Sequence, residues 1–197
     1  TLSSDVGLKG ERVMPAEIPE ERIFEAVIDT VLEFGYVGAT TKQIAERAKI
    51  SEMTLFRRFG NKDKLLRAAL RFETTKFIQE AIIYTGDVQR DLERVITTYH
   101  HLLKERGRVI LELIVEVPRR PGLRKSAHIP QEGLAQVVEL IARYQREGKV
   151  RRDPPWQAAL ELLSPVFVIH MLHLVQPLPT KVDAKNMVER FLSGWAS

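Results

Sequence analysis

Apolar residues recur at helical spacing along most of this chain. Ile23, Val27 and Val31 lie four residues apart with acidic residues on the outer face, which predicts an amphipathic helix from Pro19 that ends at Gly35. Between glycine and proline breakers, further helices are predicted at about 41–48, 52–59, 62–84, 88–106, 108–117, 130–147, 155–175 and 181–195. Few segments alternate with period two, so the pattern predicts an all-α protein without strands.

The predicted helices form two groups of different size. A three-helix unit is expected at residues 19–66, and a larger helical bundle is expected at 67–197. The fourth helix would join them. Residues 1–18 mix charges, glycine and proline without periodicity, so they are expected to be a flexible arm.

Two short helices in the N-terminal unit carry clear start signals. Thr40 is a good N-cap, and Gln43, three residues later, can complete a capping box. A tight turn is predicted at residues 49–50, and Ser51 can cap the next helix. Two short helices joined in this way form a helix-turn-helix, whose second helix enters the major groove of DNA.

Composition and charge distribution sharpen this interpretation. The chain has 197 residues, of which 44% are apolar and 28% charged, and its net charge is only +4. It has no cysteine, which excludes a disulfide framework, a thiolate nucleophile and a cysteine zinc site. Residues 42–71, however, hold nine basic and three acidic residues, so this segment carries +6 and the remainder −2. The positive charge is concentrated at the helix-turn-helix, which favours DNA as the partner.

We expect neither a targeting segment nor a membrane segment in these residues. Its first residues lack the basic and apolar regions of a signal peptide. The most apolar stretch, residues 165–175, is too short for a bilayer and contains two histidines. We therefore expect a soluble, cytoplasmic protein.

The helix-turn-helix segment resembles the DNA-binding domain of TetR-family transcriptional regulators over roughly residues 20–70. The residues that carry the resemblance are Thr40-Thr41-Lys42-Gln43-Ile44-Ala45, Ile50-Ser51, Thr54-Leu55-Phe56-Arg57-Arg58-Phe59 and Asn61-Lys62-Asp63-Lys64-Leu65-Leu66. The family usually has tyrosine where Phe56 stands, and often Tyr-His at the next two positions. The resemblance implies a helix-turn-helix DNA-binding domain followed by a helical ligand-binding and dimerisation domain.

The resemblance also implies which residues contact double-stranded DNA. Ser51 would present its hydroxyl and a helix N-terminus to phosphate, and residues 52–54 would face the bases. Arg57 would bind phosphate or guanine, and Lys62 would bind phosphate. The full set of expected DNA contacts is Thr41, Lys42, Ser51, Glu52, Met53, Thr54, Phe56, Arg57, Arg58 and Lys62.

By the same resemblance, the chain would form a homodimer through helices 155–175 and 181–195 and bind an unknown small-molecule effector. The first of these helices is apolar nearly all round, so it must be buried on several sides. Candidate effector contacts are Glu112, Glu116, Phe167, His170 and Met171. As alternatives to effector binding, the two glutamates could form a solvated stripe on a half-buried helix, and the histidine could pack in the core or at an interface. No metal site, cofactor or catalytic residue is expected.

The most consistent hypothesis is a sequence-specific repressor that a small molecule releases from a palindromic operator. An all-α enzyme is one alternative, although no Glu is followed by His three residues later and no phosphate-binding glycine loop is present. An architectural DNA binder with weak sequence preference and no effector is another.

Overall fold

The computed structural model describes residues 18–126, 128–176, 179 and 181–195. Within these ranges the chain is helical and has no strand, which confirms the prediction of an all-α fold. The elements are α1 (Glu20–Gly38), α2 (Thr41–Ala48), α3 (Glu52–Phe59), α4 (Lys62–Ala81), α5 (Val88–Glu116), the 3-10 helix η1 (Pro121–Ser126), α6 (His128–Arg146), α7 (Pro155–His173) and α8 (Ala184–Trp195).

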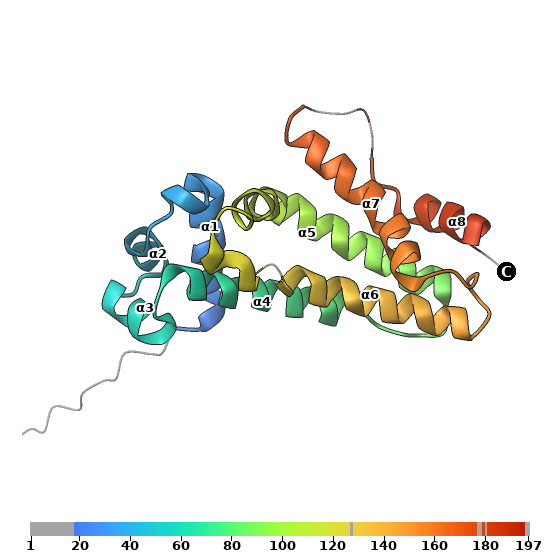
Figure 1. The fold of residues 1–197 in the computed structure, drawn as a ribbon, viewed down its shortest axis with the longest axis horizontal. Helices are drawn as coiled ribbons and strands as arrows, with labels where there is room; N and C mark the ends of the chain where they lie inside the picture. The colour runs from blue at the N-terminus through green and yellow to red at the C-terminus, as the bar shows by residue number, and fades with distance from the viewer. Residues whose placement is uncertain (1–17, 127, 177–178, 180, 196–197) are drawn as a thin grey trace, which may run out of the picture.

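The helices are arranged along one long axis, as Figure 1 shows. Helices α1, α2 and α3 gather at one end, and α4, α5 and α6 extend from them toward the other. Helix α7 packs on α5 and α6, and α8 packs mainly on α5. The long helices α4 and α5 therefore connect the helix-turn-helix end to the rest of the molecule.

Two apolar cores stabilise this arrangement. The first joins α1, α2, α3 and the start of α4, and it also includes Val109 and Leu113 from the far end of α5. The second lies among α4 to α8. Ile18, which we expected in a flexible arm, packs against the first core. Residues 1–17 of that expected arm lie outside the described residues.

The predicted break at Gly107 is wrong, because α5 runs without interruption through it. A glycine inside a helix costs about 1 kcal/mol relative to alanine, which is less than tertiary packing can supply. Gly107 is buried, and a Cβ at this position would lie 3.6 Å from Cε of Met171 on α7, an ordinary van der Waals distance. The glycine therefore lies where α7 packs on α5 and does not end the helix.

Gly35 interrupts α1 as predicted, but one further helical turn follows it. Its backbone adopts φ 68° and ψ 166°, a conformation essentially restricted to glycine. Beyond the kink, the Ala39 N–H donates to the Gly35 carbonyl at 3.0 Å. The kink brings Tyr36 into the first core, where it is buried.

A buried carboxylate fixes the start of α5. Asp91 is fully buried and accepts hydrogen bonds from the Tyr144 hydroxyl and from the backbone and hydroxyl of Thr85. Arg94 pairs with it at 3.2 Å. Burial by itself raises the pKa of Asp91, but these hydrogen bonds and the Arg94 charge together hold it below its ordinary value. The network joins α5, α6 and the segment between α4 and α5.

Candidate DNA interface

Local hydrogen bonds build the two short helices as their sequence predicts. Thr40 and Gln43 form the complete capping box of α2. Lys49 closes α2 in the left-handed conformation, with φ 59°. The Ser51 side chain accepts from the Thr54 N–H at 3.1 Å and caps α3. Leu55 anchors α3 in the core, where it is fully buried, so the opposite face of α3 points outward.

The outward face of α2 and α3 presents side chains suited to a DNA groove. Lys42, Ser51, Phe56 and Arg57 are exposed, and Met53 is 78% exposed. A methionine held so far into solvent has no packing role in this chain, and it can contact a thymine methyl group. Five of the ten DNA-contact residues expected from the sequence are therefore exposed to solvent.

Other expected DNA-contact residues have partners within the protein. The Thr41 hydroxyl donates to Glu52 at 2.6 Å, which links α2 to α3. Arg58 donates to the Ile18 carbonyl at 3.2 Å and pairs with Glu20 at 3.1 Å. The Thr54 hydroxyl lies 2.8 Å from that of Ser51. These contacts set the position of α3 against α1 and α2.

Lys62 is the most engaged of the set. Its Nζ donates to the carbonyls of Tyr36 and Ala39 at 2.6 and 2.7 Å, and it lies 4.4 Å from the centroid of the Tyr36 ring. Burial lowers the pKa of Lys62, and the nearby Arg120 charge lowers it further. Lys62 thus satisfies the carbonyls that the end of α1 leaves open.

Two exposed lysines near this surface were given no role by the resemblance. Lys49 lies in the turn between α2 and α3, and Lys64 lies in the first turn of α4. Both belong to the segment of net charge +6, so the charge count was the signal that could have identified them.

An apolar cavity of about 490 Å³ lies in the second half of the molecule. Helices α4, α5, α6 and α7 form its walls, and Ile28 of α1 contributes from the N-terminal end. Its volume lies within the ordinary range for small-molecule sites, about 300–1,000 Å³. Most of the wall is aliphatic or aromatic, including Phe77, Leu134 and Leu163.

Of the five effector contacts expected from the sequence, Phe167 lines this cavity. The other four lie elsewhere. Glu112 accepts from the Tyr36 N–H at 3.4 Å, and Glu116 pairs with Arg120 at 2.7 Å. The Cε atom of Met171 lies against Gly107.

His170 contacts a histidine that sequence reasoning did not pair with it. Its Nε2 lies 2.8 Å from Nδ1 of His100 on α5. Burial lowers the pKa of both rings. Neighbouring positive charge lowers each pKa further, from His101 and Lys104 for His100 and from His100 and His173 for His170. Among the described residues, no group of three or more potential ligands is arranged to hold a metal ion.

Comparison with known proteins settles the family. The model of the family described as "Bacterial regulatory proteins, tetR family" matches residues 23–69. The model described as "Tetracyclin repressor-like, C-terminal domain" matches residues 82–190. The second match alone covers more than half of the chain. The chain belongs to the TetR family of transcriptional regulators. This membership assigns it to DNA-binding regulators rather than to enzymes.

Relatives of this TetR-family chain match it over nearly its whole length. An uncharacterised HTH-type transcriptional regulator of Bacillus subtilis (strain 168), YvkB, is 28% identical over 181 residues, covering 88% of this chain and 95% of the relative. The HTH-type transcriptional regulator AqdR of Rhodococcus erythropolis is 26% identical over 176 residues, covering 88% and 84%. A transcriptional regulator from Rhodococcus sp. Rha1 shares the fold with a TM-score of 0.72 at 20% identity, covering 90% and 98%.

In this TetR-family protein, α5 contacts the DNA-binding end through Tyr36. The Tyr36 N–H donates to Glu112 on α5, and the guanidinium of Arg120, in the segment after α5, lies 5.6 Å from the centroid of the Tyr36 ring. The Tyr36 hydroxyl donates to Asp63 at the start of α4. Burial raises the pKa of this hydroxyl, and the bond to Asp63 raises it further. Through its backbone N–H, ring and hydroxyl, Tyr36 therefore joins α1 to the end of α5, to the segment after α5 and to α4.

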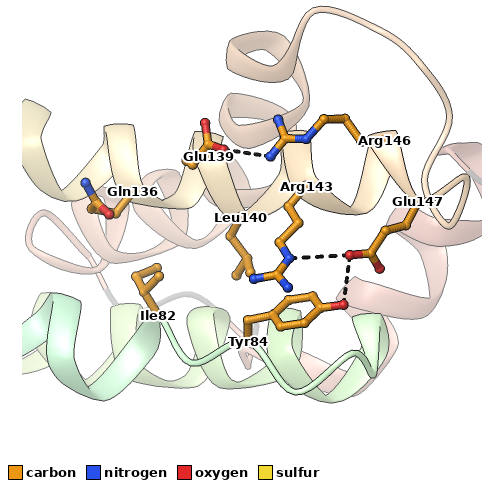
Figure 2. Close-up of a pocket in the computed structure, with 8 residues that line it drawn as sticks. All are labelled: Ile82, Tyr84, Gln136, Glu139, Leu140, Arg143, Arg146 and Glu147. Carbon is orange, nitrogen blue, oxygen red and sulfur yellow. Dashed lines mark hydrogen bonds and ion pairs between the residues drawn. The ribbon is translucent and has the colours of Figure 1, made fainter.

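A second, more open hollow of about 520 Å³ lies beside the end of α4 and α6 (Figure 2). Its charged side chains are paired with one another. Glu147 accepts from the Tyr84 hydroxyl at 2.8 Å and pairs with Arg143 at 3.4 Å, while Arg146 pairs with Glu139 at 2.8 Å. The Arg143 guanidinium also stacks 3.3 Å from the centroid of the Tyr84 ring. These pairs make the hollow a surface ion-pair network.

Among the described residues, no helix is both long and apolar enough to cross a membrane.

Proposed function

We propose that this TetR-family chain is a homodimeric repressor that binds a palindromic operator and is released by a small molecule. The observation that supports this most is the pairing of two separate features. One is the exposed α2–α3 surface, and the other is the apolar cavity, whose wall includes Ile28 from the first core. Because its target is DNA, we also propose that it acts in the cytoplasm.

The exposed side chains would make the direct contacts with DNA. We assign phosphate contacts to Lys42, Ser51 and Arg57, and base contacts to Met53 and Phe56. The residues with internal partners, among them Arg58 and Lys62, would hold α3 and α4 in position. This division follows the accessibility of each side chain, since the first group is exposed and the second is half-buried.

The homodimer would form through α7 and α8. One side of α7 is buried in the second core, through residues such as Ala158 and Val166. Another side leaves large apolar groups exposed: Trp156, Leu160, Val168 and Leu172. Exposed apolar side chains gathered on one helix favour a protein partner. A second copy would place two α3 helices on the two halves of a palindrome.

Release would follow from a shift between two conformations of the dimer. A ligand that prefers the conformation unable to match the operator weakens DNA binding by the ratio of its two affinities. Helices α4 and α5 both line the cavity and both reach the DNA-binding end. On α5, Leu113 faces the cavity while Glu112 contacts Tyr36, so a small displacement of this helix end would reach α1.

The test compares two charge-removing variants on an operator selected from random duplex DNA. Arg57→Ala removes the proposed phosphate contact, whereas Arg90→Ala removes an exposed arginine from α5. We expect about tenfold weaker binding for Arg57→Ala and a salt dependence reduced by about one counterion. Arg90→Ala should bind as the wild type does. Fluorescence anisotropy across a salt titration measures both quantities.

Equal effects of the two substitutions on DNA affinity would show that Arg57 does not contact DNA. Equal affinity of the wild type for selected and random DNA would instead favour the architectural binder. If the proposal is correct, the affinity of the wild type for the selected operator should exceed its affinity for random DNA by about a thousandfold or more.

A further inference from the structure

The polar groups in the wall of the apolar cavity constrain the chemistry of its ligand. Among the described residues that line it, two are charged, Glu73 on α4 and Arg106 on α5. They face each other, with Oε2 of Glu73 and Nε of Arg106 3.4 Å apart. Their side chains are only 15% and 21% exposed. The cavity wall is therefore electrically neutral, and its two charges neutralise each other.

This pair opposes charged ligands of either sign. A carboxylate that binds Arg106 has to displace Glu73, which leaves the Glu73 carboxylate unpaired beside aliphatic side chains. An ammonium group that binds Glu73 has to displace Arg106, which leaves the Arg106 guanidinium unpaired in the same way. Breaking a poorly solvated pair by removing one partner is strongly unfavourable, because the other charge stays without compensation.

The wall also holds four neutral polar residues, Thr74, Tyr99, Gln131 and Ser164, and Tyr99 is the one that we assign to the ligand. Tyr99 lines the cavity from α5, with its ring packed edge-on against Phe77 at 6.2 Å between centroids. Its burial raises the pKa of the hydroxyl to about 12, so the group stays protonated and can donate or accept. No described residue hydrogen-bonds to this hydroxyl, so a ligand would supply its partner.

We propose that the cavity binds an uncharged, mainly apolar molecule that carries a hydrogen-bonding group for Tyr99. This inference rests on the proposed function, since it names the chemistry of the effector that the function requires. The apolar wall supplies the affinity, the Glu73–Arg106 pair selects against charge, and Tyr99 orients the polar group.

The experiment uses the fluorescent probe N-phenyl-1-naphthylamine, an uncharged apolar molecule, with the full-length protein. Three competitors of equal chain length then displace it at neutral pH: decanol, decanoate and decylammonium. We expect decanol to displace the probe at a concentration about tenfold lower than either ion, because only the ions disrupt the charge pair. Tighter binding of decanoate or decylammonium, or equal binding of all three, would overturn the proposal.

Three variants locate the binding. Tyr99→Phe should weaken decanol about fivefold through one lost hydrogen bond, while the control Tyr84→Phe, outside the cavity, should leave it unchanged. Leu134→Trp fills space at the cavity wall and should reduce probe binding about tenfold in a sample with wild-type helicity. Probe binding that survives in Leu134→Trp, or a decanol affinity unaffected by Tyr99→Phe, would contradict the assignment.

A DNA-release assay with the same competitors separates this inference from the proposed function. Decanol that binds in the cavity but leaves the operator complex intact supports the ligand chemistry and contradicts the effector role. Release by a charged competitor but not by decanol supports the effector role and overturns the ligand chemistry. Failure of the wild type to bind the uncharged probe also overturns the ligand chemistry.

Discussion

Gly35→Ala tests the contact between α1 and α5 at a single backbone position. At φ 68° and ψ 166°, Gly35 occupies a conformation that side chains with a Cβ rarely adopt. A Cβ built here would lie 3.3 Å from Oε1 of Glu112, the carboxylate that binds the Tyr36 N–H. The substitution therefore strains the backbone and displaces the carboxylate from its partner.

The expected loss is the sum of these two effects. Backbone strain of this kind costs about 1–3 kcal/mol, and the lost hydrogen bond costs about 1 kcal/mol. A total near 3 kcal/mol lowers the melting temperature of a protein of this size by roughly 6–12 °C, since each kcal/mol corresponds to about 2–4 °C.

Thermal unfolding followed by far-UV circular dichroism measures the change, and two other glycines provide controls. Gly148 has φ 71° with nothing within 4 Å of a Cβ, so Gly148→Ala should show the strain alone. Gly38 has no positive φ and lies near Phe34, so Gly38→Ala should show neither effect. A melting temperature for Gly35→Ala equal to that of wild type would refute the strain, and one equal to that of Gly148→Ala would refute the role of Glu112.

Three further predictions follow from the buried polar groups and the proposed dimer. Asp91→Asn removes the charge from a fully buried hydrogen-bond network, so urea unfolding should show a loss of about 2–3 kcal/mol, and an unchanged midpoint would contradict the network's role. His100 and His170 have lowered pKa values, so the folded chain binds fewer protons than the unfolded one, in which the pKa is about 6.5. The stability that this pair contributes is complete above that value and is lost as the pH falls below it, so the melting temperature should drop between about pH 7 and pH 5. The drop should be smaller in His170→Gln, and the exposed control His128→Gln should show the same drop as the wild type. Equal slopes of melting temperature against pH in the wild type and both variants would contradict the assignment. Leu172→Glu places a charge on the proposed dimer face, so sedimentation should show monomers at concentrations where the wild type is dimeric, and a persistent dimer would place the interface elsewhere.

The sequence predicted the α2–α3 region well because its determinants are local. Thr40, Gln43 and Ser51 act on backbone groups within three residues of themselves, so their spacing alone defines the helix starts. The same reasoning wrongly predicted a helix end at Gly107, because it used only the local sequence. The packing of α7 on α5, which involves residues far along the chain, can outweigh the helix cost of one glycine.

The two candidate sites differ in how well the sequence predicted their residues, for a related reason. Residues on α2 and α3 that face outward could be inferred from periodicity and resemblance, although the engagement of Lys62 by two carbonyls of α1 could not. In the larger bundle, periodicity identifies the face of a helix but not the helix it meets. Phe167 was therefore expected at the cavity, whereas the charged residues of its wall, Glu73 and Arg106, were not.

Selection of binding sites from random duplex DNA tests the central claim most directly. A dimer that presents two α3 helices should enrich a palindrome whose half-site centres lie about 34 Å apart, bound by two chains, and the complex should dissociate when an uncharged apolar ligand fills the cavity. Enrichment of no motif, or of a single half-site bound by one chain, would contradict the account of a dimeric, sequence-specific regulator.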